Sequence, residues 1–170
     1  MRIRAEQAAD FDAIHEVVAA AFGRPNEAEL VRLLRETDSY VPQLALVAED
    51  DDRIVGHIML TYAELHGTGA DRVLSLAPLA VRPESQRGGV GIALTKAALD
   101  AADARDEPLV IVLGHAEYYP RFGFESARNY GIDPPDDAVP DEVFMVVRLR
   151  AYDPEIRGRV AYPPAFADTA

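Results

Sequence analysis

The segment PESQRGGVGIAL, residues 83–94, places three glycines within four residues. It follows an apolar run, residues 72–81, and leads into a segment rich in Ala and Leu, which are strong helix formers. The first amides of a helix have no partners within it, and the helix dipole puts partial positive charge at that end. Glycine permits positive φ and removes side chains that would keep a phosphate from those amides. The segment therefore indicates either a phosphate-binding turn or a tight connection that simply requires glycine.

Two familiar nucleotide-binding patterns fit this segment poorly. A Walker A loop needs Lys followed by Ser or Thr directly after its last glycine, whereas this chain has Thr95 before Lys96. A dinucleotide-binding turn that starts at Gly89 and Gly91 would have Leu94 at its third glycine position. The first pattern is excluded, and a dinucleotide-dependent oxidoreductase is disfavoured.

Length, charge and the lack of cysteine narrow the class of protein. A chain of 170 residues is the size of one domain, and we expect a single domain over 1–170. Its 17 Lys and Arg against 29 Asp and Glu give a net charge of −12, which disfavours nucleic acid and anionic membranes as partners. No cysteine means no disulfide and no thiol nucleophile. The N-terminal residues lack the apolar core of a signal peptide, so we expect a cytoplasmic protein.

The apolar pattern predicts a mixed α+β fold. Helices are expected over 10–22, 26–37 and 92–104, with Asp10 and Asn26 as N-caps and Gly23 as a stop. Strands are expected over 2–6, 44–49, 54–65, 72–81, 109–113 and 142–149, and the acidic turn 50–53 indicates an antiparallel hairpin. Pro78 makes 72–81 an edge or bulged strand. Because a helix joins 72–81 to 109–113, these two strands should be parallel.

Two motifs resemble one enzyme family. Gln86-Arg87-Gly88-Gly89-Val90-Gly91 is similar to the Gln/Arg-x-x-Gly-x-Gly/Ala element of the GNAT superfamily of acyl-CoA N-acyltransferases. One helix and one strand later, LGHAEYYPRFGF, residues 113–124, places Tyr119 four residues before Gly123-Phe124, as in the same superfamily. The sequence YYPRFGF, residues 118–124, resembles the corresponding segment in a bacterial branch of predicted N-acetyltransferases. The resemblance covers residues 2–149 and leaves 150–170 as a C-terminal extension.

The resemblance implies a fold, a donor and a reaction. The fold is a mixed sheet of about six to seven strands with a splayed parallel pair, flanked by about four helices. The reaction is direct transfer of an acetyl group from acetyl-CoA to a primary amine in a ternary complex, with no metal. A non-catalytic acyl-CoA-binding sensor or scaffold is the alternative. The residues that the resemblance assigns to coenzyme A are Leu79, Ala80, Val81, Gln86, Arg87, Gly88, Gly89, Val90, Gly91, Ile92 and Tyr119.

The resemblance also suggests the groups that move protons. Tyr119 would protonate the departing thiolate, whereas we expect Tyr118 to serve packing. Many relatives carry a carboxylate base on the strand that corresponds to 72–81, but this chain has none there. The resemblance names no substitute for it. His115 and Glu117 follow the buried strand 109–113, where the splayed strands should open, and on that ground His115 is the first candidate base and Glu117 the second. The acceptor amine is not encoded by a readable motif, and the apolar last strand and aromatic tail are the segments through which a homodimer would form.

Overall fold

The computed structural model describes all residues 1–170 and divides into two compact units. Unit 1 comprises residues 1–61, 77–101 and 164–170, and unit 2 comprises residues 62–76 and 102–163. The elements β3 (Arg53–Thr68), β4 (Arg72–Val81) and α3 (Val90–Ala104) each have residues in both units. The two units are described in turn below.

The strands of unit 1 form an antiparallel arrangement. β1 (Arg2–Ala5) pairs with β2 (Tyr40–Asp50), and β2 pairs with β3 down to Asp50 and Arg53. The tight turn that joins β2 to β3 is made by Asp51 and Asp52, which have positive φ of 48° and 59°. Short acidic side chains tolerate this conformation better than bulky ones do. The predicted hairpin is confirmed, and both of its strands are longer than the apolar pattern indicated.

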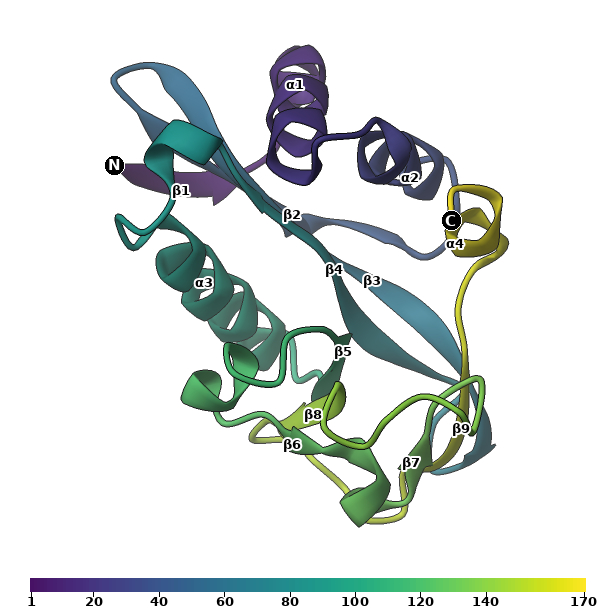
Figure 1. Cartoon of the computed structure of the whole chain (residues 1–170). Coiled ribbons are helices and arrows are strands. Elements are labelled where there is room, and N and C mark those ends of the chain that lie inside the picture. Colours follow the sequence, from purple (N-terminus) through teal and green to yellow (C-terminus); the bar gives the residue numbers. More distant parts are fainter. The chain divides into compact units, whose positions relative to one another are not determined.

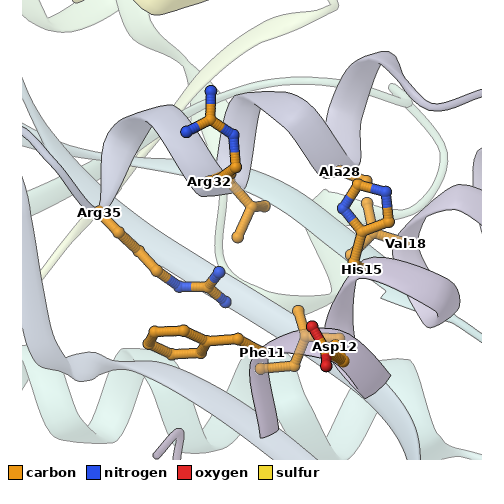
Figure 2. A pocket seen from close by; sticks show the side chains of 9 residues that line it. Phe11, Asp12, His15, Val18, Ala28, Arg32 and Arg35 are labelled. Atoms are coloured by element: carbon orange, nitrogen blue, oxygen red, sulfur yellow. The ribbon is translucent and has the colours of Figure 1, made fainter. Parts of the chain in front are cut away.

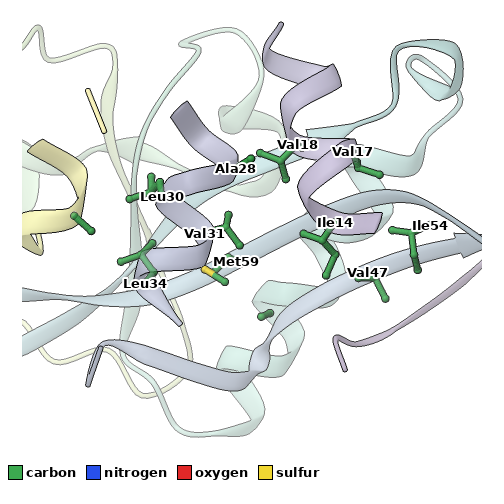
Figure 3. Close-up of a cluster of buried hydrophobic side chains, with 13 residues drawn as sticks. Ile14, Val17, Val18, Ala28, Leu30, Val31, Leu34, Val47, Ile54 and Met59 are labelled. Carbon is green, nitrogen blue, oxygen red and sulfur yellow. The ribbon is translucent and has the colours of Figure 1, made fainter. Parts of the chain in front are cut away.

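Helices cover both faces of these strands. The core on one face is formed with α1 (Phe11–Phe22), α2 (Asn26–Leu34) and the short α4 (Pro164–Asp168), while α3 lies on the other face (Figure 1). The side chains of α1 and α2 meet those of β2 and β3 in a core of aliphatic residues (Figure 3): Ile14, Val17, Val18, Leu30, Val31, Leu34, Val47, Ile54 and Met59. Both helices are therefore fixed by apolar burial along one stripe.

The predicted helix caps are only partly correct. Gly23 ends α1 in the left-handed conformation, as expected. Asp10 precedes α1 but does not cap it, because its carboxylate accepts hydrogen bonds from the Arg4 guanidinium at 2.7 and 3.0 Å and from the Gln7 amide at 2.8 Å. Asn26 is already the first residue of α2, and its Nδ2 donates to the Thr169 carbonyl at 3.1 Å. Asp10 thus occupies the N-cap position as predicted, but its side chain bonds residues before the helix and does not cap it. The prediction for Asn26 is wrong, because the N-cap position is Pro25 and a partner distant in sequence takes the Asn26 side chain.

Unit 2 contains the parallel pair. β5 (Leu109–Leu113) pairs in parallel with β4 through Leu74–Leu76, and antiparallel with β8 (Phe144–Arg148). The crossover prediction is therefore confirmed. The parallel ladder ends at Leu76, while β4 continues to Val81 in unit 1. The core of unit 2 gathers buried side chains from these strands and from the segments after them, including Val73, Leu109, Ile111, Phe144, Val146, Ile156 and Val160.

The structure has nine strands, more than the six to seven expected. The additional ones are the two-residue β6 (Glu125–Ser126) and β7 (Ile132–Asp133), and β9 (Arg157–Ala161), which pairs with β3 and β7. β9 reads RGRVA, which lacks apolar alternation, and its Gly158 would place a Cβ only 2.4 Å from the His66 carbonyl oxygen. This strand forms because its backbone lies very close to that of β3, and a pattern of apolar residues does not predict such a contact.

The segments considered for a homodimer are used within the chain. β8 is hydrogen-bonded on both sides, to β5 and to β6. In the tail, Ala165 is buried in the core of unit 1 and Phe166 packs against the same core. The structure has four α-helices, as expected, and none of them has both the length and the apolar character needed to cross a bilayer.

A buried charged cluster connects four segments of unit 1: the end of β1, the end of α2, and the strands β2 and β3. The Glu6 carboxylate, whose side chain is fully buried, accepts hydrogen bonds from Arg35 Nη2 at 2.6 Å and from the Tyr40 hydroxyl at 3.1 Å. His57 Nε2 lies 3.6 Å from the same carboxylate. Burial alone would raise the pKa of Glu6, but His57 and Arg35 outweigh it and lower the pKa from 4.5 to about 2. The cluster is therefore held by an ionised carboxylate.

Replacing Arg35 with Met, which keeps the aliphatic stem, leaves this buried carboxylate without its guanidinium. We expect the free energy of unfolding at pH 7 to fall by about 3–5 kcal/mol, the usual cost of removing one partner from a buried ion pair. Because Glu6 has a lowered pKa, its contribution is present above about pH 4.5 and is lost as pH falls toward 2. Urea unfolding at neutral and acidic pH should show the gap between the two proteins narrowing as pH falls.

The matched control is Arg32→Met. Arg32 forms ion pairs with Glu29 and Glu36 on the exposed surface of α2, and such pairs contribute little to stability. Equal losses of stability in the two variants would contradict a special role for the buried cluster.

Candidate functional site

The glycine segment forms an exposed turn between strand and helix. β4 ends at Val81, a short 3-10 helix spans Pro83–Ser85, and α3 begins at Val90, two residues earlier than predicted. Residues 86–89 are exposed, whereas Val90 is buried. Arg87 and Gly89 have positive φ of 65° and 89°. The turn thus has the left-handed backbone that glycine favours, and it stands open to solvent.

The first backbone amides of α3 have no hydrogen-bond acceptors within the helix. The first amide to find a helical acceptor is that of Ala93, which donates to the Gly89 carbonyl at 3.0 Å. The amides of Val90, Gly91 and Ile92 precede it. A Cβ on Gly89 would meet nothing within 4 Å, and one on Gly88 would only touch the Ser85 carbonyl oxygen at 3.5 Å. Open space therefore adjoins a helix end with partial positive charge, which suits an anion.

The turn is anchored to the strands behind it. Gln86 Nε2 donates to the Val81 carbonyl at 3.0 Å, so this side chain holds the turn to the end of β4. Arg82 bonds β3 twice, through its backbone amide to the Val55 carbonyl at 2.8 Å and through Nε to the Ile54 carbonyl at 2.7 Å. Arg87, by contrast, is exposed and makes no hydrogen bond within the chain. Of the two polar side chains at the start of the motif, only Arg87 is available to a ligand.

Gly56 positions the start of α3 and was not singled out from the sequence. A Cβ on Gly56 would lie 2.8 Å from Leu94 Cδ1, 2.9 Å from Val90 Cγ1 and 3.2 Å from the Ala80 carbonyl oxygen. These distances are shorter than van der Waals contact, so only glycine lets the first turns of α3 lie this close to β3 and β4. A glycine inside an apolar strand run is a sign of such close approach, although the sequence does not say what approaches.

The residues predicted to bind coenzyme A all lie in unit 1, apart from Tyr119. Leu79 and Val81 are half-buried on β4 and Ala80 is buried, while residues 86–92 form the turn and the first turn of α3. His115, Glu117 and Tyr119 lie in unit 2, in the segment after β5. The side chains of His115 and Glu117 are exposed and make no hydrogen bonds within the chain.

Tyr119 is the buried polar residue of that segment. Its ring packs edge-on against Tyr118, with centroids 5.0 Å apart, and against Phe124, at 5.5 Å. Its hydroxyl donates no hydrogen bond to any group of the protein. Burial, with a smaller contribution from Tyr118, raises the pKa of Tyr119 to about 12. The phenol therefore stays protonated at neutral pH and keeps its proton for an external acceptor.

One further hollow lies between α1 and α2, with a volume of about 180 Å³ (Figure 2). Its walls include Phe11, Val18 and Ala28, and its rim carries Arg32 and Arg35. Both guanidinium groups are already paired, Arg32 with Glu29 and Glu36 and Arg35 with Glu6. The rim therefore offers no unpaired guanidinium to a ligand. No group of three or more His, Asp or Glu side chains suited to a metal ion is present.

Comparison with known proteins assigns the family. The profile of the acetyltransferase (GNAT) domain matches residues 2–127. The chain belongs to the GNAT acetyltransferase family. It is 37% identical over 155 residues to the uncharacterized N-acetyltransferase YjhQ of Escherichia coli, covering 89% of this chain and 86% of the relative. The family resemblance inferred from the two motifs is confirmed, and with it the acetyltransferase class.

Two solved structures of GNAT proteins are similar over nearly the whole chain. E. coli YhbS in complex with CoA has a TM-score of 0.87 and 29% identity, covering 98% of this chain and 91% of the other. A Brucella melitensis GNAT acetyltransferase in complex with acetyl-CoA has a TM-score of 0.78 and 29% identity, covering 97% of each chain. The mixed sheet with its parallel pair is thus the GNAT fold.

The contact at Gly56 yields a stability prediction. In Gly56→Ala the new methyl must push α3 away from β3, and we expect the free energy of unfolding to fall by about 1–3 kcal/mol, as for other overpacked cores. Denaturant unfolding measures this. Gly88→Ala is the matched control, because its Cβ meets only one atom, at an ordinary 3.5 Å. An equal loss in both variants would show that the cost is not steric.

Proposed function

We propose that this GNAT protein is an N-acetyltransferase that uses acetyl-CoA to acetylate a primary amine by direct attack in a ternary complex. The observation that carries the proposal is the open turn 86–89, whose glycines expose the first amides of α3. The CoA-bound and acetyl-CoA-bound relatives support this choice of donor. The two motifs recognised in the sequence supply the roles of the individual residues.

The diphosphate of the donor would sit on the amides of residues 87–92. This arrangement uses the partial positive charge of the helix end and places no side chain between the backbone and the phosphates. Arg87, exposed and unpaired, would add a charge-assisted contact, which is about twice as strong as a neutral hydrogen bond. Gln86 would act indirectly, since its amide group is bonded to Val81.

The pantetheine arm would pair with the backbone of Leu79, Ala80 and Val81. This part of β4 lies beyond the parallel ladder, which ends at Leu76. An extended arm can add to such a strand through main-chain hydrogen bonds, as peptides do in β-augmentation. The side chain of Ala80 can remain in the core while its backbone binds the donor. A backbone amide near Leu79 or Ala80 would also polarise the thioester carbonyl.

Tyr119 would donate its proton to the leaving thiolate. With its pKa raised to about 12, the phenol is fully protonated wherever the enzyme works. An ordinary thiol has a pKa near 8.5, so complete transfer of the proton from this phenol remains uphill even after the thiolate has formed. We therefore propose that a hydrogen bond from Tyr119 to the developing thiolate provides the main stabilisation. Water restores the balance of protons after coenzyme A leaves, by protonating the thiolate or any phenolate that a complete transfer produces.

The acceptor amine must lose a proton before or during its attack. His115 is our first proposal for the base and Glu117 the second. Both side chains are exposed and free of internal hydrogen bonds, and imidazole groups generally titrate near neutral pH. The net charge of −12 favours a cationic acceptor, whether a small molecule or a polypeptide. We further propose that both units belong to one domain, 1–170, because β3, β4 and α3 run through both.

Gly89→Ala tests the diphosphate site. Alanine at a φ of 89° strains the turn by about 1–3 kcal/mol, and its methyl would stand where the phosphates approach. We expect coenzyme A to bind about tenfold more weakly or worse, whereas pantetheine, which lacks the diphosphate, should be unaffected. Calorimetry measures the first, and competition against acetyl-CoA measures the second.

Gly23→Ala is the matched control for backbone strain. Gly23 also has a positive φ, 68°, and a Cβ there also meets nothing within 4 Å. We expect a similar loss of stability in this variant with unchanged affinity for coenzyme A. If coenzyme A binds equally well to both variants and to the wild type, the turn does not hold the diphosphate.

Tyr119→Phe tests the proton donor. Removing the hydroxyl should lower kcat by about 100-fold or more, in the range for a lost general acid, and leave the affinity for coenzyme A nearly unchanged. The assay is release of free thiol from acetyl-CoA with a panel of amines, polyamines, aminoglycosides and peptides. Tyr118→Phe, which keeps the packed ring, is the control and should retain activity. Equal turnover in wild type and Tyr119→Phe would remove Tyr119 from the mechanism. A protein that binds coenzyme A but releases no thiol with any amine of the panel would be a binding module.

A further inference from the structure

We infer that Gly114 is the positioning residue for Tyr119: its missing side chain leaves the space that the hydroxyl end of the tyrosine ring occupies. Gly114 directly follows β5, five residues before Tyr119, and both lie in unit 2. The inference rests on the proposed role of Tyr119, and it adds a residue that neither motif assigns a task.

The contact falls on the Cδ2–Cε2 side of the ring and is tightest at Cε2, the atom next to the carbon that bears the hydroxyl. A Cβ on Gly114 would lie 2.6 Å from Tyr119 Cε2, 3.2 Å from Cδ2 and 3.6 Å from Cζ. Cε2 is bonded to Cζ, the carbon that bears the hydroxyl. A methyl group at residue 114 would therefore push directly on the part of the side chain that carries the proton. To reach 3.4 Å, where ordinary contact begins, Cε2 would have to move by about 0.8 Å.

The backbone on both sides of the contact is fixed. The Gly114 amide donates to the Val143 carbonyl at 2.9 Å, directly after the ladder between β5 and β8. The amides of Tyr118 and Tyr119 both point to the His115 carbonyl, at 3.1 and 3.4 Å. Neither chain segment can withdraw without breaking these hydrogen bonds, so an added methyl group would be accommodated by movement of the Tyr119 ring.

The ring has little freedom to move along its other sides. Tyr118 and Phe124 contact it edge-on, at interplanar angles of 88° and 70°, and close-packed aromatic contacts of this kind resist displacement. A push from residue 114 would therefore tilt the hydroxyl out of its place rather than shift the whole side chain. Burial is also what raises the pKa of Tyr119, so a tilted ring would lose part of that effect.

Replacing Gly114 with Ala tests the steric effect of a side chain without adding backbone strain. The φ of Gly114 is not positive, unlike those of Gly123 and Gly131 nearby, so an L-residue meets no backbone penalty there. Gly114→Ala adds one methyl group and removes no hydrogen bond. Any change in activity beyond the change in stability must then come through what the methyl group touches, which is the Tyr119 ring.

A double-mutant cycle with Tyr119→Phe carries the test. We expect Gly114→Ala to lower kcat by about 10- to 100-fold, since misplacing a catalytic group by about 1 Å has such effects, with KM for acetyl-CoA nearly unchanged. In the Tyr119→Phe background the same methyl group still displaces the ring, but no hydroxyl remains to be misplaced. The double variant should therefore be no slower than Tyr119→Phe, so that the two changes are strongly non-additive. Additive losses would overturn the inference.

A crystal structure of Gly114→Ala gives a readout independent of activity, in which the Tyr119 ring should be displaced by about 0.8 Å or more. If the ring moves but Tyr119→Phe has normal kcat, Gly114 positions the ring and the proposed proton donor is wrong. If Tyr119→Phe is slow but Gly114→Ala leaves both kcat and the ring unchanged, the proton donor stands and the positioning role of Gly114 is overturned. Thermal unfolding of all four proteins separates these outcomes from a general loss of fold.

Discussion

The start of α3, where we propose that the diphosphate binds, depends on one steric fact, the absence of a side chain at Gly56. Three atoms from two segments lie within 3.2 Å of where a Cβ would be, two of them from the first turns of α3 and the third from the backbone of β4. The helix can therefore begin directly against the strands. Because its first amides are then set beside the end of β4, the turn 86–89 needs only a few residues to connect the two. The flexible glycines of the turn are useful only because this rigid contact fixes where the helix starts.

Unit 1 surrounds this contact with two different kinds of support. Aliphatic side chains from α1 and α2 cover the opposite face of the strands, and they supply most of the stabilisation through apolar burial. The Glu6 cluster adds a polar connection between the end of β1, the end of α2 and the strands β2 and β3. Buried charges are poor sources of net stability, but they penalise any arrangement in which their partners are separated. The cluster therefore disfavours arrangements in which these segments are separated.

The sequence predicted those features that are encoded locally. The hairpin of β2 and β3, the crossover from β4 to β5, and the turn with its helix follow from apolar period, turn residues and glycine spacing, and each is found where it was expected. Features that depend on a distant neighbour were missed. Asn26 is of a residue type that is favoured at N-caps, yet its side chain donates to the carbonyl of Thr169, near the other end of the chain. β9 has no apolar alternation, and it pairs with β3 through close contact between the two backbones.

The same distinction separates the two groups of glycines. Gly88, Gly89 and Gly91 form a motif because their function, exposing a backbone, can be read from their spacing. Gly56 and Gly114 are single glycines within or after apolar strands, and the atoms that require them come from residues 24 to 38 positions away for Gly56 and five positions away for Gly114. The short spacing between Gly114 and the pair Tyr118-Tyr119, four and five residues, is the only feature of the sequence that could have suggested a contact between Gly114 and Tyr119. The spacing does not say which part of the ring the glycine faces, and only the fold shows that it is the side that includes Cε2.

Burial raises the pKa of both Glu6 and Tyr119, but only around Glu6 do partners outweigh it. Glu6 is buried with cationic and hydrogen-bonding partners that outweigh desolvation, and its pKa falls to about 2. Tyr119 is buried without such partners, and its pKa rises to about 12. The first group is thereby committed to a permanent charge and to structure. The second retains a proton that nothing in the protein competes for, and its hydrogen bond is available to an external anion. A leaving thiolate is such an anion, and an aromatic setting without fixed charges makes the hydrogen bond strongest when the negative charge on sulfur appears.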